Sequence, residues 1–222
     1  MLGGGLMRPA IVAALAAGLL AGAIGYRTIQ PKPPQPPVIG PGSISYEMTA
    51  AAQARRSQML VGALLVFGDS LTVGLATSLV APDAENFGIN SDTIAGLTAR
   101  LPLYRLAGQR GVVLAIGLND FAPAPAGWRA AYARLLAAIP PTIPVTAVSI
   151  TPTARGSLPA NSDIDRANGQ IRLACADRPG CRFLDLNSHL KDRSGFLDRQ
   201  FDAGDGIHLS PAGSRVWIAM LK

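Results

Sequence analysis

Four polar residues occur in the order and in the surroundings that nucleophilic catalysis needs. Ser70 comes directly after the apolar run 64–67 and a Gly-Asp pair, and Asn119 follows a second apolar run. Asp205 and His208 lie three residues apart near the C-terminus. A serine hydroxyl becomes a nucleophile when a neighbouring base takes its proton, and histidine can take that proton and return it to a leaving group. Asp205 is placed to orient the His208 ring and to stabilise its charged form.

The tetrahedral oxyanion that such an attack creates needs hydrogen-bond donors. We predict three of them, because preorganised donors stabilise the charge that develops on the carbonyl oxygen. They are the backbone N–H of Ser70 at the start of a helix, the side-chain amide of Asn119, and one further backbone N–H.

The segments around these residues predict where they meet. Short apolar runs alternate with helical patterns, which predicts a parallel sheet covered by helices on both faces. Sites in such open sheets form at the carboxyl ends of the strands, where Ser70, Asn119 and His208 are all expected. The expected strands are 64–67, 85–89, 111–116, 145–150 and 182–186, and the expected helices are 46–60, 71–80, 92–104, 126–138, 161–175 and 211–221.

Three blocks of the chain resemble the SGNH hydrolases, the GDSL esterase/lipase superfamily. Residues 68–71 (Gly-Asp-Ser-Leu) resemble the first block of that family, residues 117–120 (Gly-Leu-Asn-Asp) its G-x-N-D block, and residues 205–208 (Asp-Gly-Ile-His) its D-x-x-H block. The resemblance covers roughly residues 62–222. It implies an α/β fold, a three-layer α/β/α sandwich with a central five-stranded parallel sheet of the flavodoxin-like kind. It also implies ester hydrolysis without a metal or an organic cofactor.

The second block departs from the family pattern. Residues 86–93 resemble N-x-x-x-x-G-D-T, but Ser91 stands where many members have the glycine of the oxyanion hole. Gly88 is the alternative donor, since some members have an earlier glycine. A backbone N–H does this work, so a serine need not abolish activity. Ser91 and Gly88 therefore both stand as candidates for the remaining donor.

Four further polar residues are interpreted as non-catalytic. Asp69 and Asp120 are expected to support turns or to cap helices, and His189 is expected on the surface. Asp202 could compete with Asp205 as the orienting acid, but its spacing from the histidine does not match the D-x-x-H block.

An uncharged segment near the N-terminus indicates export. Residues 9–26 lie between Arg8 and Arg27 and would span about 27 Å as a helix, close to the hydrocarbon thickness of a bilayer. We predict that residues 1–29 are a cleavable signal peptide or an uncleaved membrane anchor. Both predict a periplasmic or other extracytoplasmic location, and an anchor would place the chain in the inner membrane. The proline-rich residues 30–45 are the expected linker, and residues 46–222 the expected hydrolase domain.

The charge distribution argues against a nucleic-acid partner. The net charge is +6, but residues 61–222 contribute only +2 of it. No basic cluster is dense enough to predict nucleic-acid binding.

Cys175 and Cys181 are the only cysteines, and they bracket a segment with a Pro-Gly turn. An oxidising compartment favours a disulfide between them, and the alternative is a pair of reduced thiols. Two thiols without a nearby histidine cannot complete a zinc site.

These features together predict an exported serine esterase. Little chain remains for a lid, so we expect an open site, with residues 121–128 as a candidate apolar wall. An open site suits short acyl esters of envelope polysaccharide, or lysophospholipid at the membrane. Two alternatives are acyl transfer to a carbohydrate by the same residues, and a catalytically silent binding domain of the envelope. The sequence does not indicate an oligomeric state.

Overall fold

The computed structural model describes residues 40–122 and 127–222. The predicted signal peptide or anchor (1–29) and most of the predicted linker (30–45) therefore lie outside the described residues. Within the described ranges, no helix is both long enough and apolar enough to cross a bilayer.

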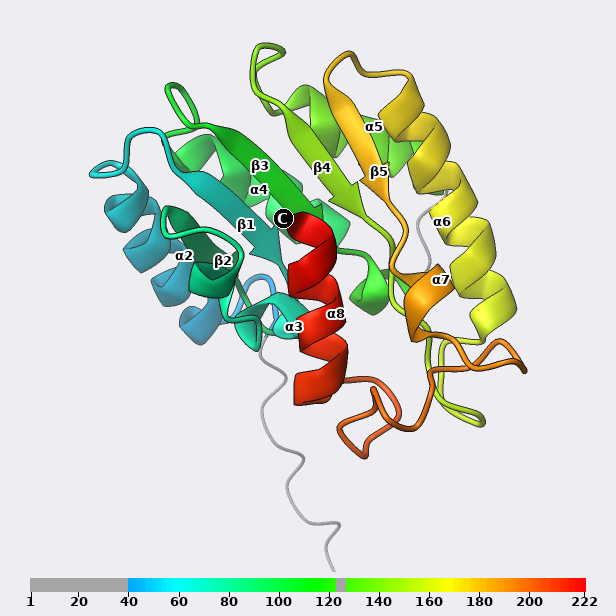
Figure 1. The fold of residues 1–222 in the computed structure, drawn as a ribbon. Helices are drawn as coiled ribbons and strands as arrows, with labels where there is room; N and C mark the ends of the chain where they lie inside the picture. Colours follow the sequence, from blue (N-terminus) through cyan, green and yellow to red (C-terminus); the bar gives the residue numbers. More distant parts are fainter. Residues whose placement is uncertain (1–39, 123–126) are drawn as a thin grey trace, which may run out of the picture. The chain divides into compact units, whose positions relative to one another are not determined.

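Five parallel strands form one sheet, in the order β2-β1-β3-β4-β5 (Figure 1). This order confirms the predicted flavodoxin-like arrangement. In such sheets the chain moves outward in both directions from the point between β1 and β3, and ligands bind at the carboxyl ends of the strands there. The strands are β1 (Leu64–Gly68), β2 (Ala84–Gly88), β3 (Gly111–Ala115), β4 (Val145–Val148) and β5 (Cys181–Leu184).

Helices cover both faces of the sheet and complete the three layers (Figure 1). The first face is covered by α2 (Ile44–Ser57), α4 (Ile94–Arg100), α5 (Trp128–Ala137) and α6 (Asn161–Ala176). The opposite face is covered by α3 (Ser70–Val73), α7 (Asn187–Leu190) and α8 (Pro211–Leu221). Three short 3-10 helices connect these elements: η1 (Thr77–Leu79), η2 (Leu101–Leu103) and η3 (Leu118–Phe121).

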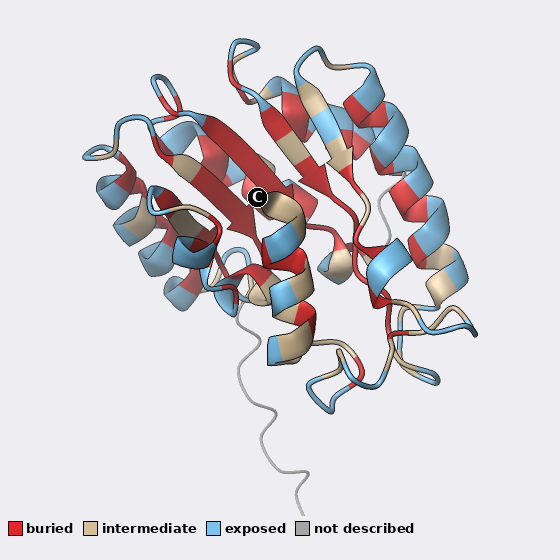
Figure 2. Ribbon diagram, viewed as in Figure 1, coloured by how far each residue is buried: buried red, intermediate tan, exposed pale blue. Residues whose placement is uncertain are grey.

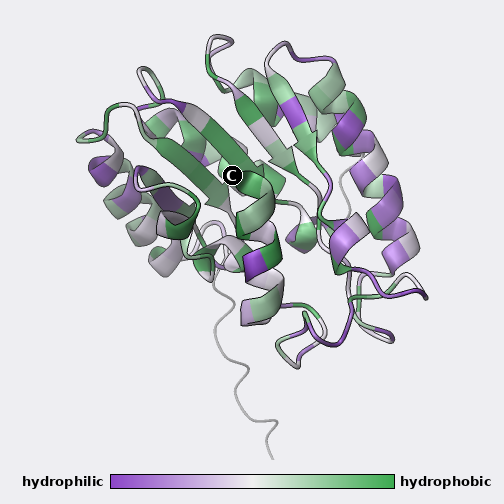
Figure 3. Cartoon of the chain, in the orientation of Figure 1, coloured by the Kyte–Doolittle hydropathy of each residue, from purple (hydrophilic) through white to green (hydrophobic). Residues whose placement is uncertain are grey.

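The strands bury side chains on both faces, as a covered parallel sheet requires. In β1, Leu65 and Phe67 pack in the core beneath α4 and α5, whereas Val66 packs in the core beneath α8. Successive side chains of a strand point to opposite faces, so one apolar run supplies both cores. Figure 2 shows β1 and β3 buried along most of their length, and Figure 3 shows that they are hydrophobic while the outer side of α6 is largely hydrophilic.

Several helices begin or end at other residues than predicted. The predicted helix 71–80 is only α3, because the chain leaves the helix at Gly74 and continues as η1. The predicted helix 92–104 begins at Ile94, where the Thr93 side chain caps it, and changes to η2 at Leu101, directly before Pro102, which lacks an N–H for an α-helical hydrogen bond. α2 begins two residues before the predicted start, because the Ser43 side chain accepts the first-turn N–H of Tyr46.

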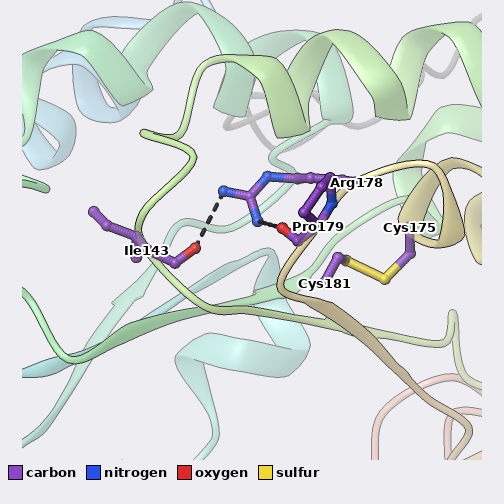
Figure 4. Close-up of a disulfide and its surroundings, with 5 residues drawn as sticks. All are labelled: Ile143, Cys175, Arg178, Pro179 and Cys181. Atoms are coloured by element: carbon purple, nitrogen blue, oxygen red, sulfur yellow. Dashed lines mark hydrogen bonds between the residues drawn. A yellow bond between two sulfur atoms is a disulfide. The ribbon is translucent and has the colours of Figure 1, made fainter.

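A disulfide joins the end of α6 to the start of β5 (Figure 4). It links Cys175 to Cys181. In the loop between them, the Arg178 guanidinium donates to the carbonyl oxygens of Ile143 at 3.1 Å and Pro179 at 3.3 Å. The disulfide lies at the amino end of β5, and so at the edge of the sheet opposite the one that carries Ser70.

Candidate active site

Ser70, His208 and Asp205 form a hydrogen-bonded chain at the carboxyl edge of the sheet. Ser70 Oγ lies 2.9 Å from His208 Nε2, and His208 Nδ1 lies 2.6 Å from Asp205 Oδ2. With the ring proton on Nδ1, Nε2 is free to accept the proton of the serine hydroxyl. Ser70 begins α3 directly after β1, and His208 is supplied by the loop before α8. The structure thus brings together three residues that the sequence predicted to meet.

The loop that carries Asp205 holds it in place. Asp205 Oδ1 accepts the backbone N–H groups of Ile207 at 3.0 Å and His208 at 2.8 Å. Hydrogen bonds from the His208 N–H, the His208 ring and the Ile207 N–H lower the pKa of Asp205 to about 2. The carboxylate is therefore ionised at neutral pH and can stabilise an imidazolium. The neighbouring Asp202 instead accepts two glycine N–H groups within the loop.

Gly68 and Asp69 allow Ser70 to occupy the first position of α3, directly after the end of β1. Asp69 caps α3 by accepting the N–H of Leu71 at 3.0 Å. A β-carbon at Gly68 would lie 2.1 Å from Thr72 Oγ1 and 2.3 Å from a carbonyl oxygen of β3. Only glycine therefore lets α3 pack directly on the ends of β1 and β3, with Ser70 at its first position.

Asn119 is held by one of its own amide hydrogens. Its Nδ2 donates to the backbone oxygen of Asp92 at 2.9 Å. Within the described part of the chain the second amide hydrogen has no acceptor, so it is oriented but available, as an oxyanion donor must be. Asn119 lies in η3, which follows β3 through Gly117. Gly117 has a φ of 133°, and a β-carbon there would lie 2.8 Å from a methyl carbon of Ile150, so this turn requires glycine.

The structure separates the two candidates for the remaining donor. The Gly88 N–H donates to Asn86 Oδ1 at 2.9 Å and is therefore occupied. In residues 40–122 and 127–222, the Ser91 N–H has no hydrogen-bond acceptor. Ser91 has a φ of 59°, the left-handed conformation that glycine adopts without strain. Ser91 thus keeps the backbone shape of the glycine that the family pattern has there, and fits the donor better than Gly88.

Each of the three loops also carries a buried aspartate next to its candidate residue. All three carboxylates accept a backbone N–H of the site loops, which makes them structural supports. Burial raises the pKa of all three, to about 7 for Asp69 and to about 6 for Asp120. The pairs are Asp69 with Ser70, Asp92 with Ser91, and Asp120 with Asn119.

An apolar pocket of about 420 Å³ opens beside Asn119. Leu118 and Phe121 line it together with Leu158 and Pro159 of the loop before α6. The ring of Phe121 packs on the ring of Trp128, with 4.8 Å between their centroids. These two aromatic residues belong to the predicted apolar wall, whose residues 123–126 lie outside the described part of the chain.

The sequence did not reveal the residues that hold Asp92. Tyr46 of α2 and Arg100 of α4 both bind its carboxylate. A tyrosine in one helix and an arginine in another form no local sequence pattern, and the two side chains meet only because both bind Asp92 in the folded protein. The family block that contains Asp92 was the one local signal for this support.

The arrangement is suited to acyl transfer. A serine hydroxyl lies next to an imidazole that a carboxylate orients, and the Asn119 amide is bound to the carbonyl oxygen of Asp92, the residue after Ser91. These are the groups that attack an ester carbonyl and hold its tetrahedral oxyanion.

Comparisons with known proteins agree with this chemistry and this fold. A protein from Streptococcus pneumonia, whose name refers to platelet activating factor, superposes with a TM-score of 0.71 at 18% identity, covering 94% of this chain and 97% of its own. A GDSL-like lipase from Bacteroides thetaiotaomicron gives 0.64 at 16% identity, covering 78% and 94%. An acetyl xylan esterase variant from Geobacillus stearothermophilus gives 0.59 at 18% identity, covering 72% and 96%. No curated protein sequence matched the chain.

At these identities the structural neighbours establish the fold alone, and the family assignment comes from the sequence. Residues 66–216 match the model of the GDSL-like Lipase/Acylhydrolase family, and this range includes Ser70, Ser91, Asn119, Asp205 and His208. The chain therefore belongs to the GDSL-like lipase/acylhydrolase family, which is a family of carboxylic ester hydrolases.

Proposed function

We propose that the protein hydrolyses carboxylic esters through an acyl-enzyme on Ser70. Ser70 Oγ attacks the ester carbonyl carbon while His208 Nε2 takes the hydroxyl proton. Asp205 keeps the ring oriented and stabilises the imidazolium. His208 then gives the proton to the departing alkoxide, which leaves as an alcohol. A water molecule attacks the acyl-enzyme by the same route, which releases the acid and restores the hydroxyl.

The oxyanion of each step accepts the N–H groups of Ser70 and Ser91 and the amide of Asn119 in this proposal. The observation that carries the mechanism is the unbroken chain from Ser70 Oγ to His208 Nε2 at 2.9 Å and from His208 Nδ1 to Asp205 Oδ2 at 2.6 Å. A catalytically silent domain would have no need of this alignment.

Labelling with a fluorophosphonate tests the nucleophile. The phosphonate forms a bond to an activated serine oxygen and loses fluoride, so we expect one adduct on Ser70, found by mass spectrometry of the peptides. Ser70→Ala should abolish labelling and lower kcat by about 10⁴-fold or more, while leaving the melting temperature nearly unchanged. Folded wild-type protein without an adduct would contradict both the hydrolase and the transferase.

For the substrate we propose short acyl esters of carbohydrate, with lysophospholipid as the alternative. The supporting observation is the openness of the site: the side chains of His208 and Asp205 are 44% and 54% exposed. A bulky polysaccharide can approach such a site, and a neighbour of the same fold is an acetyl xylan esterase. The p-nitrophenyl esters of acetate and octanoate separate the two, because equal turnover of both would contradict the preference for short acyl groups.

Acyl transfer to a sugar is the second candidate, and the same exposure of the catalytic loop favours it, since a sugar hydroxyl could replace water. Incubation with an acetyl ester and an added polysaccharide distinguishes the two. Recovery of all the transferred acetyl groups as free acetate supports hydrolysis, and acetylated polysaccharide supports transfer; the alcohol of the ester is released in both cases.

We further propose that residues 1–29 export the protein and that the esterase works outside the cytoplasm. The uncharged residues 9–26 support this proposal. Fractionation of cells that express the full chain, followed by N-terminal sequencing, tests this proposal. A signal peptide predicts a mature protein without this segment. An anchor predicts an intact chain in the membrane fraction. An intact chain in the cytosol would contradict export.

A further inference from the structure

Asp92 is a fully buried carboxylate directly beside the candidate donor Ser91. Its side chain has no solvent-exposed surface. Tyr46 Oη donates to Asp92 Oδ1 at 2.7 Å, and Arg100 Nε donates to Asp92 Oδ2 at 2.9 Å. The N–H of Thr93 also donates to Oδ1, at 2.8 Å. A buried carboxylate with this many donors is fixed in position, because losing any one of them would leave charge unpaired in the interior.

The backbone of Asp92 is linked to two of the proposed oxyanion donors, the Ser91 N–H and the Asn119 amide. Its N–H is part of the turn that includes Ser91, and donates to Ile89 O at 3.2 Å. Its carbonyl oxygen accepts from Asn119 Nδ2 at 2.9 Å. A shift of Asp92 would therefore move the Ser91 peptide and the Asn119 amide together.

Two elements on different sides of the loop hold this aspartate. Arg100 also donates to Phe87 O at 2.9 Å and to Tyr104 Oη at 2.7 Å, which ties it to β2 and to the segment after η2. Tyr46 lies in the first turn of α2, a helix outside residues 66–216 that match the family. The residues before α2 rest on the same loop: a β-carbon built on Gly40 would lie 3.8 Å from Ser91 Cβ.

We propose that Tyr46, from the helix that precedes the family match, is a positioning residue for the oxyanion hole. Its hydroxyl holds Asp92 from the α2 side, while Arg100 holds it from the α4 side. Asp92 in turn sets the direction of the Ser91 N–H and of the Asn119 amide. The inference rests on the proposed function, since it concerns the donors of that reaction.

Tyr46→Phe tests this inference, because it removes only the hydroxyl and keeps the ring that packs in the core. We expect kcat for p-nitrophenyl acetate to fall about tenfold, less than the 10²–10³ seen when a whole oxyanion donor is removed, with KM within about twofold of the wild type. Phenylboronic acid provides a second readout. Its boron bonds to the serine oxygen and becomes tetrahedral, so an oxygen enters the hole, and its inhibition constant should rise in proportion to the fall in kcat.

Tyr132→Phe is the matched control. Tyr132 is also fully buried, its hydroxyl has no hydrogen-bond partner in the described residues, and it belongs to α5. We expect this variant to keep kcat, KM and the inhibition constant. All rates are measured well below the melting temperature of each variant. Tyr46→Met, which also lacks the hydroxyl and keeps an apolar side chain, replaces Tyr46→Phe if that variant does not fold.

The outcomes separate this inference from the proposed function. If the wild type neither hydrolyses the ester nor reacts with a fluorophosphonate, the proposed function fails. If the wild type is active and Tyr46→Phe keeps its kcat and its boronate affinity, the positioning role is overturned. A rise in KM alone would overturn it as well, because a change in the hole acts on the transition state.

Discussion

At the residue scale, the conformation of the Ser91 backbone matters more to the proposed oxyanion hole than the Ser91 side chain does. In the proposed mechanism Ser91 donates its backbone N–H, and its left-handed φ of 59° is the conformation that a glycine adopts without strain. A residue with a β-carbon in this conformation costs roughly 1–2 kcal/mol. The loop holds Ser91 in it through Asp92, whose carboxylate is fully buried. The serine is therefore a strained substitute for glycine, and its hydroxyl has no assigned part in the chemistry.

Ser91→Gly follows from this description. We expect the free energy of unfolding to stay within about 1 kcal/mol of the wild type, since relief of strain is offset by the greater entropy of an unfolded glycine. We expect kcat and KM to stay within about twofold, because the N–H remains in place. Chemical denaturation and steady-state kinetics measure both.

Ser91→Ala is the companion variant, since it keeps the β-carbon and the strain but lacks the hydroxyl. Equal activity of the alanine, glycine and wild-type proteins is expected. A large loss of kcat in both variants would show that the hydroxyl itself takes part.

At the element scale, two glycines on neighbouring strands allow α3 to pack closely against the sheet, because neither has a β-carbon. A β-carbon at Gly68 would lie 2.1 Å from Thr72 Oγ1, and one at Gly88 would lie 2.6 Å from Val73 N. Both contacts are with α3, the helix that begins with Ser70. The glycine at the end of β2 therefore has a steric role, and its N–H is used by Asn86.

Gly88→Ala should displace α3, because the new methyl group meets backbone atoms that cannot rotate away. We expect a loss of about 1–3 kcal/mol in the free energy of unfolding, as for other overpacked cores. A shift of Ser70 should also lower kcat by about 10²-fold, since misplacement of a reacting group by 1 Å has that effect. Denaturant unfolding and turnover of p-nitrophenyl acetate measure the two changes.

Gly169→Ala is the control for this experiment. Gly169 lies in α6, and a β-carbon there meets no atom within 4 Å. This variant should gain roughly 0.5–1 kcal/mol from higher helix propensity and keep its activity. Similar behaviour of the two alanine variants would contradict the steric role of Gly88.

The same elements show how far the sequence predicts this molecule. Buried parallel strands are nearly continuous apolar runs, so β1 was predicted from its first residue, and β4 ends at Val148, only two residues before the predicted end. Ser70 and His208 were predictable because their motifs are short and local. The choice between Gly88 and Ser91 was not, since it depends on where Asn86 places its oxygen. The hydrogen bond between Tyr46 and Asp92 could not be predicted either, because it joins residues that are 46 positions apart in the sequence.

At the scale of the whole molecule, three buried aspartate side chains lie at the carboxyl edge of the sheet. Asp69, Asp92 and Asp120 all lie beneath the site, and the charges of Asp92 and Asp120 help to raise the pKa of Asp69. Arg100 is the cation that pairs with Asp92. The fold therefore keeps acidic groups in a place where ionisation is unfavourable, which makes its stability depend on pH.

Burial raises the pKa of Asp69 from 3.8 to about 7. The folded protein then holds this proton between about pH 4 and 7, while the unfolded chain has released it. The contribution of Asp69 to stability therefore falls as pH rises through this window, because the native state binds more protons there, and this loss is complete above the folded pKa. Asp205, with its pKa lowered to about 2, acts in the opposite sense and only below pH 4.

Asp69→Asn tests this linkage, because the amide has the shape of the protonated acid and retains an oxygen that can accept the Leu71 N–H. We expect the variant and the wild type to have similar free energies of unfolding near pH 4. Above pH 7 the variant should be the more stable, by on the order of 4 kcal/mol, since each unit of pKa shift corresponds to about 1.4 kcal/mol. Urea unfolding of both proteins from pH 4 to 8 gives the difference directly, and titration of the other carboxylates largely cancels in it. A difference that does not change with pH would mean that Asp69 is already ionised in the folded protein at pH 4, and that its partners, rather than its burial, control its charge.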